Sequence, residues 1–323
     1  MLNVLITGSS GFVGARLAES LAAEGHRVVG TGRGKAAPEG SHGAYMAADL
    51  LSPADCLKIC AGIDAIVHCA GKAGAWGPYA EYEKANVTST ANLIKGAKQA
   101  GVKRFINISS PSIYFAYKHQ LALKESDLPP KFSNAYAATK YVAEEVVAAA
   151  HKPNFLTVSL RPRGIIGAGD RNWLPRIIEM RRTGSLIQPG DGKNVVDFTS
   201  IGNLLDVIAA CLTAPAAAMG ATYNISNGTP EYLWDVIDAA LAAVGLDGKR
   251  KRLPLAVAMA AAHLSEWNGK LRGLKDEPAL LPIKVGVAAY SMTMNISAAK
   301  TRLGYKPRLT TAQGIEEFAQ WWT

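Results

Sequence analysis

Short apolar runs alternate with stretches of helical spacing through the first half of the chain. The runs occupy residues 2–6, 28–31, 44–47, 65–69, 104–108 and 156–160. Continuous apolar runs of this length are typical of strands that are buried on both faces. Between them, residues 15–21, 81–100 and 136–150 have the spacing of helices. The alternation predicts an α/β fold built on a doubly wound parallel sheet.

The second half of the chain has a different pattern. Residues 173–178 begin a predicted helix, residues 195–199 are strand-like, and residues 223–228 read as a strand that ends in a turn. We expect these elements to build a smaller C-terminal α/β lobe. The predicted division places the first domain at residues 1–165 and the lobe at residues 166–323, and the chain can cross back between them.

The composition narrows the class of protein and of partner. The 323 residues are 49% hydrophobic, which is enough for a sizeable core, and no run is long enough to span a bilayer. Because the chain begins at once with a core strand, we expect a cytoplasmic protein. The net charge of +9 is spread along the chain without a nucleic-acid motif. We therefore expect anionic small molecules, and no nucleic acid, as partners.

The spacing of cysteine and histidine argues against a metal site. The four cysteines lack the paired spacing of metal ligands and are predicted to be small core residues: Cys56, Cys60, Cys69 and Cys211. His68 belongs to a predicted strand, and we expect His263 to be a partly buried helix residue. Neither histidine has a second ligand at metal spacing, so we predict no bound metal.

A glycine-rich turn lies between the first strand and the first helix, in residues 7–14. Glycines let the chain reverse tightly and let backbone amides approach a pyrophosphate, which then lies at the positive end of the helix. The alternative is a flexible turn before a surface helix, which the flanking strand and helix disfavour. The turn residues predicted to bind a dinucleotide cofactor are Gly8, Ser10, Gly11, Phe12, Val13 and Gly14.

The end of the second strand indicates which dinucleotide is bound. An acidic residue at this place hydrogen-bonds the ribose of NAD, but here the sequence is Thr31-Gly32-Arg33-Gly34. Arg33 can form charge-assisted hydrogen bonds to a 2′-phosphate, which favours NADP(H) over NAD(H), unless Arg33 is only a solvated loop charge. Asp49 either accepts a hydrogen bond from the adenine amino group or caps the helix that follows Ser52, and both interpretations stay open.

Three further residues form a candidate proton-transfer site. Ser110 follows the fifth strand, and Tyr136 and Lys140 lie four residues apart on one face of a predicted helix. A free phenol has a pKa of roughly 10, and a neighbouring lysine cation stabilises its anion. Ser110 can donate a hydrogen bond to a substrate oxygen that gains negative charge. The pattern therefore predicts Tyr136 as general acid/base, Lys140 as its activator and Ser110 as the carbonyl polariser.

Together these motifs resemble the extended short-chain dehydrogenase/reductases, in the NAD-dependent epimerase/dehydratase superfamily, over most of the chain. The resemblance rests on the glycine turn, Asp49-Leu50, His68-Cys69-Ala70-Gly71, Asn86-Val87-x-x-Thr90, Ser109-Ser110, Tyr136-x-x-x-Lys140, Arg161-Pro162 and Gly167-x-Gly169-Asp170. It implies a Rossmann fold, a ribose contact for Lys140, and a role for Asn86 in holding backbone and water in the site. Further cofactor contacts that it implies are Leu50, Ala70, Lys72, Ser109, Pro162 and Ile165. Ser89 and Ala168 stand where the family often has glycine and proline, away from the chemistry.

Within that family the chain looks most like the branch of 3β-hydroxysteroid dehydrogenases and bacterial 2-alkyl-3-oxoalkanoate reductases. Residues 71–79 and 160–167 carry this closer likeness. Trp76 and Tyr79 either wall an apolar substrate pocket or pack their loop onto the domain, and both interpretations stay open. Ser112 and Trp173 are the other candidate substrate residues.

Residues 249–275 combine positive charge with apolar residues. Between Gly245 and Lys275 there are seven Lys or Arg residues against Asp247 and Glu266. The pattern predicts a basic, apolar helix that lies on an anionic membrane surface, covers a lipid pocket, or packs in the core.

The sequence thus predicts an NADP-dependent reductase or dehydrogenase that interconverts a ketone and a secondary alcohol. The substrate class is largely apolar, a 3-oxo fatty acyl compound, a 2-alkyl-3-oxoalkanoate or a steroid-like ring. A sugar-nucleotide epimerase that retains NAD and a non-catalytic NADP-binding regulator are the alternatives. The resemblance also implies a homodimer formed through the helices at residues 81–100 and 136–150.

Overall fold

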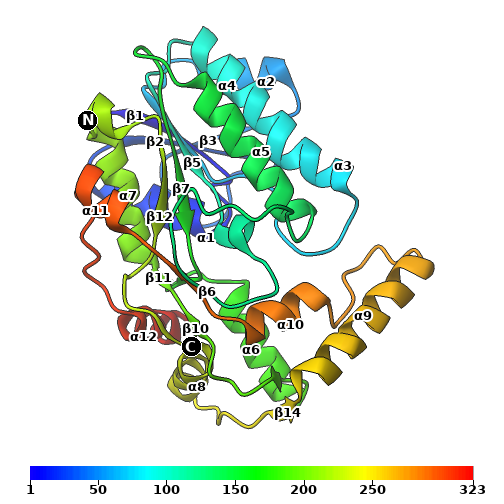
Figure 1. The fold of residues 1–323 in the computed structure, drawn as a ribbon. Coiled ribbons are helices and arrows are strands. Elements are labelled where there is room, and N and C mark those ends of the chain that lie inside the picture. The colour runs from blue at the N-terminus through cyan, green and yellow to red at the C-terminus, as the bar shows by residue number, and fades with distance from the viewer. Residues whose placement is uncertain (323) are drawn as a thin grey trace.

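A seven-stranded parallel sheet forms the centre of the molecule in the computed structural model, which describes residues 1–322 (Figure 1). The strand order is β12-β7-β5-β4-β1-β2-β3, and every neighbouring pair is parallel. The strands are β1 (Asn3–Thr7), β2 (Arg27–Gly32), β3 (Ala44–Ala47), β4 (Ala65–His68), β5 (Arg104–Ile108), β7 (Leu156–Pro162) and β12 (Thr222–Ile225). The predicted doubly wound α/β fold is confirmed.

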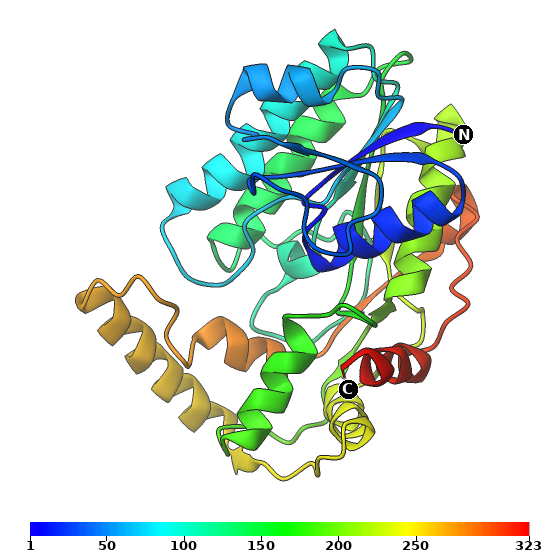
Figure 2. The same ribbon diagram turned by 180° about the vertical axis from the view of Figure 1, so that it is seen from behind.

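Helices cover both faces of this sheet (Figures 1 and 2). One layer consists of α1 (Phe12–Ala23) and α7 (Ile201–Thr213), whose apolar side chains share a core with β1, β5 and β7. The other consists of α2 (Pro53–Ile59), α4 (Ser89–Gln99) and α5 (Ala135–Ala150). Burial on both faces explains why the strands are continuous apolar runs. Cys56, Cys60 and Cys211 are buried in these cores and Cys69 is partly exposed.

The single helix predicted over residues 81–100 is three consecutive elements. These are α3 (Tyr79–Tyr82), the π-helical segment η1 (Glu83–Thr88) and α4. Hydroxyl groups in this region bond to helix carbonyls: Ser89 Oγ donates to Ala85 O and Thr90 Oγ1 donates to Asn86 O, each at 2.6 Å. Such bonds compete with the regular backbone pattern and accompany the irregular turn.

A second, four-stranded sheet has the order β13-β10-β15-β6. Its strands are β6 (Gln120–Leu123), β10 (Val195–Val196), β13 (Glu231–Tyr232) and β15 (Met292–Met294). The adjoining core is built by α6 (Trp173–Arg182), α8 (Leu233–Ala243) and α12 (Thr311–Trp322). The strand predicted over residues 195–199 is divided into β10 and β11 (Thr199–Ser200), and β11 pairs with β8 (Ile165–Ile166).

The chain returns to the large sheet after entering this second region. β12 pairs in parallel with β7 at the edge of the seven-stranded sheet, so the prediction that this strand belongs to the smaller lobe is wrong. The preceding α7 also packs on the large sheet. The remaining short elements are η2 (Pro111–Tyr114), β9 (Ile187–Pro189), η3 (Ala216–Ala218), β14 (Lys251–Leu253), α10 (Pro282–Ala289) and α11 (Ser297–Arg302).

The basic, apolar segment forms α9 (Leu255–Leu271), preceded by the short strand β14. Figures 1 and 2 both show α9 along the outer edge of the molecule, joined by a loop to α10. Only Ala258, Ala262 and Gly269 of this helix are buried, so it is not a core helix. The prediction that His263 is partly buried is wrong, because this residue is exposed to solvent. Among residues 1–322, no helix has the length and apolar character needed to cross a membrane.

Candidate active site

The glycine turn follows β1 and begins α1, as its sequence predicts. Gly8 has a φ of +68° and donates from its backbone nitrogen to Thr31 O at 3.0 Å. A Cβ at Gly14 would lie 2.3 Å from Gly8 O, so only glycine allows this close approach. Gly11 is the N-cap of α1, and the backbone nitrogens of the first helical turn are therefore directed toward the turn. These features fit the pyrophosphate of a dinucleotide.

The ends of β2 and β3 lie beside this turn. Arg33 follows β2 in an exposed loop and has no ion pair among residues 1–322. Asp49 is exposed after β3, and its Oδ1 accepts from Leu51 N at 3.0 Å. The cap of α2 is Ser52, whose Oγ accepts from Asp55 N at 3.2 Å, so Asp49 is not the helix cap. The adenine contact of Asp49 stays a prediction, as does that of its partly buried neighbour Leu50.

The segment after β4 is held by Asn86. Asn86 Oδ1 accepts from Lys72 N at 2.7 Å, and Asn86 Nδ2 donates to Lys72 O and to Thr139 Oγ1, each at 3.1 Å. Ala70 is fixed from the other side, because Ala70 N donates to Thr7 Oγ1 at 3.2 Å. The Lys72 ammonium forms an ion pair with Glu81. The structure therefore brings Ala70, Lys72 and Asn86 together at the carboxyl edge of the sheet.

Two serines follow β5 on the same edge. Ser109 is buried, and its Oγ has no hydrogen-bond partner among residues 1–322. Because buried polar groups are normally hydrogen-bonded, this hydroxyl is a candidate ligand contact. Ser110 caps the short helix η2, where its Oγ accepts from Ser112 N at 3.2 Å and lies 3.0 Å from Ser112 Oγ. Ser112 thus contacts the catalytic candidate directly.

Tyr136 and Lys140 come from the first turns of α5, whose N-cap Asn134 accepts from Ala137 N at 2.8 Å. Burial raises the pKa of Tyr136, and a hydrogen bond with the Ser110 hydroxyl opposes that rise. The Lys140 Nζ donates to Ile108 O at 2.7 Å. Burial lowers the pKa of Lys140 to about 8, against the opposing effect of the Glu144 carboxylate. Ser110, Tyr136 and Lys140 therefore converge at the ends of β5 and α5.

The candidate substrate residues occupy separate positions around this edge. Trp76 packs onto the α9 region: its Nε1 donates to Leu274 O at 2.9 Å, and its ring would meet a Cβ at Gly269. These contacts show that Trp76 packs its loop onto the protein. Tyr79 is 52% exposed at the start of α3. Trp173 begins α6, and its ring centroid lies 5.4 Å from that of Phe198.

Arg163 is a candidate that the sequence argument missed. It directly follows Pro162, the last residue of β7, at the same carboxyl edge as Ser110, and Ile165 lies two residues further on in β8. Its buried Nε has no hydrogen-bond partner among residues 1–322. Burial lowers the pKa of Arg163 to about 10, although the Asp197 carboxylate opposes this. The available signal was a second arginine directly after Arg161-Pro162, at the end of a predicted strand.

His68 is structural. It is buried in β4, with Nδ1 2.7 Å from Thr7 Oγ1 and Nε2 3.0 Å from Thr90 Oγ1. Burial, together with the nearby Lys140 charge, lowers the pKa of His68 to about 3, so the ring is neutral at physiological pH. Within residues 1–322 no group of His, Cys, Asp and Glu side chains is arranged to hold a metal ion.

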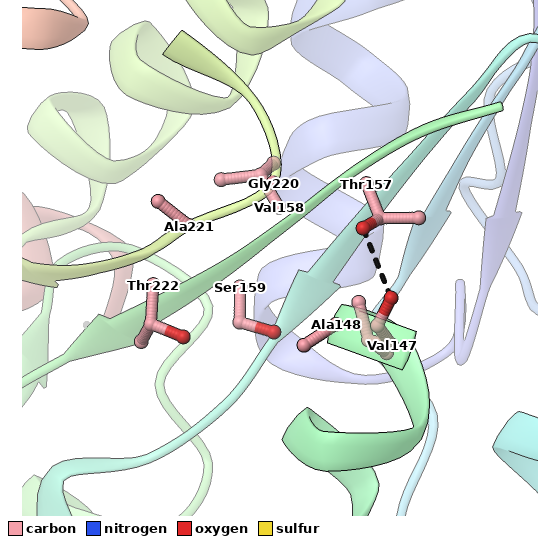
Figure 3. Close-up of a pocket in the computed structure, with 8 residues that line it drawn as sticks. All are labelled: Val147, Ala148, Thr157, Val158, Ser159, Gly220, Ala221 and Thr222. Carbon is pink, nitrogen blue, oxygen red and sulfur yellow. Dashed lines mark hydrogen bonds between the residues drawn. The ribbon is translucent and has the colours of Figure 1, made fainter. Parts of the chain in front are cut away.

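A small cavity lies away from these residues, between the C-terminal end of α5 and the beginning of β7 (Figure 3). Thr157 Oγ1 donates to Val147 O at 2.9 Å beside it. Its volume of about 40 Å³ accommodates water but not an organic substrate. Tyr136 lies near the other end of α5, so this cavity is not part of the candidate active site.

Comparison with known proteins identifies the family. Residues 4–226 match a family described as the NAD dependent epimerase/dehydratase family. A 2-alkyl-3-oxoalkanoate reductase of Stenotrophomonas maltophilia is 35% identical over 321 residues, covering 97% of each chain. A decarboxylating sterol-4-alpha-carboxylate 3-dehydrogenase of Saccharomyces cerevisiae is 36% identical over 267 residues, covering 79% of this chain and 76% of that protein.

Solved structures show the same fold. The UDP-glucuronic acid 4-epimerase of Bacillus cereus in complex with NAD superposes with a TM-score of 0.77 at 23% identity. The match covers 99% of this chain and 98% of the epimerase. Because the identity is low, this likeness concerns the fold alone. The matched family and the two relatives, taken with the glycine turn and the Ser110, Tyr136 and Lys140 set, show that the chain belongs to the NAD-dependent epimerase/dehydratase family and is an NAD(P)-dependent oxidoreductase.

Proposed function

We propose that this protein is an NADPH-dependent reductase of a 3-oxo acid with a large apolar part. The observation that carries the proposal is the convergence of Tyr136, Ser110 and Lys140 at the carboxyl edge of the sheet. A hydroxyl, a phenol and a buried ammonium in this arrangement can polarise a carbonyl and move one proton.

The residues at the glycine turn fit a nicotinamide dinucleotide. Gly8 and Gly14 form the tight turn, the first turn of α1 offers its backbone nitrogens, and the unpartnered Ser109 Oγ offers a further donor. Arg33, which is exposed and has no ion pair in the described part of the chain, supports NADP(H) because it can bind a 2′-phosphate. When bound, the nicotinamide supplies the hydride that reduces the carbonyl carbon.

The protein's own residues supply the proton. Ser110 donates a hydrogen bond to the carbonyl oxygen as negative charge develops there. Tyr136 then gives its phenolic proton to that oxygen, which completes the alcohol. Burial keeps Tyr136 protonated near neutral pH, which suits a general acid in the direction of reduction. Lys140 holds positive charge beside the site while its buried ammonium is anchored to Ile108 O.

Arg163 supports the proposal that the substrate carries a carboxylate. The partly buried guanidinium lies at the carboxyl edge, and its Nε has no hydrogen-bond partner among residues 1–322, so it can bind an anionic ligand. The nearby Asp197 is already used, since its oxygens accept from Met294 N at 2.6 Å and from Ser226 Oγ at 3.1 Å. Both relatives described above are named for substrates that carry a carboxylate. A steroid-like acid and a 2-alkyl-3-oxo fatty acid both meet this description.

The test is oxidation of NADPH and NADH by the purified protein, followed by absorbance, with a 2-alkyl-3-oxo fatty acid, a 3-oxosteroid carboxylate and a UDP-sugar. We expect turnover with NADPH and a 3-oxo acid. Tyr136→Phe should lower kcat by about 10²–10⁴-fold. Tyr305→Phe, which removes a buried hydroxyl bonded to Ser226 O, is the matched control and should retain turnover.

Two results would overturn the proposal. Conversion of the UDP-sugar without net oxidation of NADPH would identify a sugar-nucleotide epimerase. Binding of NADPH without turnover of any ketone would favour a non-catalytic binding protein. Full turnover by Tyr136→Phe would remove the assigned mechanism while leaving the reductase class intact.

A further inference from the structure

α9 is apolar on two opposite sides. Ala258, Ala262 and Gly269 recur along the side that faces the protein, where the helix packs beside Val285 of α10. On the opposite side, large apolar residues face solvent at spacings of three, four and seven, which places them in one stripe. This outer stripe consists of Val257 (53% exposed), Leu264 (65%), Trp267 (61%) and Leu271 (69%).

Such a stripe is unusual for a protein surface. Isolated exposed apolar side chains are common, but four in one line on a single helix expose a continuous apolar strip. Leu274, in the loop after the helix, is 40% exposed and follows Leu271 by three residues, which continues the spacing of the stripe. Figures 1 and 2 show that α9 lies at the periphery, and no other helix of residues 1–322 covers this side.

Unpaired basic residues stand at both ends of the outer stripe. Lys251 and Arg252 precede the helix and Arg272 and Lys275 follow it, all exposed. None of these four has an ion pair within residues 1–322. In contrast, the neighbouring Arg250 and Lys270 are neutralised by Asp238 and Glu266. A helix of 17 residues is about 25 Å long, so the two cationic ends are well separated along one line.

We propose that α9 binds an anionic lipid surface, lying flat with its outer stripe in the interfacial region. The apolar stripe requires an apolar partner, and the cations at both ends select one that carries negative charge over a wide area. A tryptophan within the stripe suits the boundary between head groups and acyl chains. Charge complementarity thus favours an acidic phospholipid surface over a second copy of this basic chain, whose net charge is +9.

The proposed lipid contact adjoins the candidate active site. The loop after β4, which contains Lys72, is attached to the loop that follows α9, because Trp76 Nε1 donates to Leu274 O. It is also attached through Ala75 N, which donates to Glu277 Oε2 at 3.3 Å. Contact of α9 with lipid would therefore place this rim of the site near the source of an apolar substrate. The binding of lipid itself does not depend on the proposed reductase function.

The test is flotation of the full-length protein with vesicles of phosphatidylcholine alone and with vesicles of equal parts phosphatidylcholine and phosphatidylglycerol. We expect binding to the anionic vesicles only, weakening as salt is raised. The double variant Leu264→Glu with Trp267→Glu should abolish binding. Arg272→Gln with Lys275→Gln should weaken it by about tenfold or more, because each basic residue contributes separately to binding an anionic surface.

Matched controls come from the opposite end of the molecule, on α2 and α4 (Figure 1). Leu57→Glu places a glutamate at an exposed apolar position, and Lys58→Gln with Lys95→Gln removes two exposed cations. Both should bind vesicles like the parent protein, and all variants should keep its thermal unfolding midpoint.

Three outcomes would overturn the proposal. One is the absence of binding to either vesicle, and another is binding that the α9 variants leave unchanged. The third is a change of oligomeric state, measured by sedimentation velocity, caused by Leu264→Glu with Trp267→Glu, which would assign the stripe to a second copy of the chain. None of these measurements uses a substrate, so failure of the reductase proposal leaves the lipid test intact.

Discussion

The side chain of Asn86 binds the backbone of Lys72 at both its nitrogen and its oxygen. The two distances are 2.7 Å from Lys72 N to Asn86 Oδ1 and 3.1 Å from Asn86 Nδ2 to Lys72 O. A Cβ at the adjacent Gly71 would lie 2.9 Å from Asn86 Oδ1, so the segment fits closely against this amide. The η1 helix thereby sets the position of the loop that borders the candidate nicotinamide site.

Asn86→Ala should reduce both stability and turnover. It leaves the partly buried backbone nitrogen and oxygen of Lys72 without these partners, at a cost of about 1–3 kcal/mol in the free energy of unfolding. Because the loop also borders the reaction site, kcat should fall by about tenfold or more. Thermal unfolding and steady-state kinetics measure the two effects. The matched control is Asn203→Ala, since Asn203 binds the backbone of Arg308 and Leu309 away from the site. Equal loss of kcat in both variants would refute a positioning role.

Arg33→Gln should change the choice of cofactor. Loss of a charge-assisted bond to the 2′-phosphate should raise the KM for NADPH by about 10–100-fold and leave the KM for NADH nearly unchanged. Arg27→Gln is the control, because Arg27 is an exposed cation at the opposite end of the same strand. If both KM values change together, Arg33 does not select the cofactor.

Arg163→Met should weaken binding of a 3-oxo acid through the loss of its carboxylate partner. We expect the KM for the acid to rise by about tenfold or more, with little change in kcat. The methyl ester of the same acid is the internal control, because it has the same carbonyl and no negative charge. An equal rise in KM for acid and ester would contradict recognition of the carboxylate.

The sequence located the large sheet well because burial on both faces leaves a local signature. Each continuous apolar run became a strand whose central residues agree with the prediction, as at β5 (Arg104–Ile108). The misassigned strand β12 shows the limit of this signature. A strand of four residues, Thr222–Ile225, has the same local pattern in either lobe, and only its pairing with β7 decides where it belongs.

The candidate site also contains residues that local sequence patterns indicate and residues that only the folded structure reveals. Ser110, Tyr136 and Lys140 are indicated by residue type and local spacing, and their elements bring them together. The contact between Trp76 and Leu274 joins residues 198 positions apart, so no local pattern could choose between the two interpretations of Trp76. Arg163 was missed for a related reason: the absence of a partner for its Nε is a property of the folded surroundings.

Acidification should destabilise the protein through His68. Its pKa in the folded protein is about 3, below the ordinary value of 6.5, so the unfolded chain binds the proton more tightly. The stabilisation is therefore complete above about pH 6.5 and is lost as the pH falls toward 3, with a slope of at most about 1.4 kcal/mol per pH unit from this residue. Urea unfolding between these pH values measures the slope. His68→Gln should flatten it, whereas the exposed His263→Gln should not, and an unchanged slope in His68→Gln would refute the assignment.

The buried pair of Glu144 and Arg161 links stability to the site. Arg161 Nε donates to Glu144 Oε1 at 2.8 Å, and Arg161 Nη2 donates to Glu144 Oε2 at 2.5 Å. Both side chains are only 3% exposed. Arg161 also donates to the Tyr114 hydroxyl, so the guanidinium is enclosed by partners. Removing one charge leaves the other buried without compensation, which is more costly than removing both.

Glu144→Gln should therefore lower the free energy of unfolding by about 3–5 kcal/mol, and adding Arg161→Met should recover part of that loss. The exposed pair of Asp206 and Arg308 is the matched control, because Asp206→Asn should cost less than about 1 kcal/mol. Glu144 also opposes the burial effect that lowers the pKa of Lys140 to about 8. Without this carboxylate, the pKa of Lys140 falls further, so the alkaline loss of kcat/KM should begin at a lower pH. A pH profile that keeps its alkaline limb in Glu144→Gln would show that the charge of Lys140 does not limit turnover.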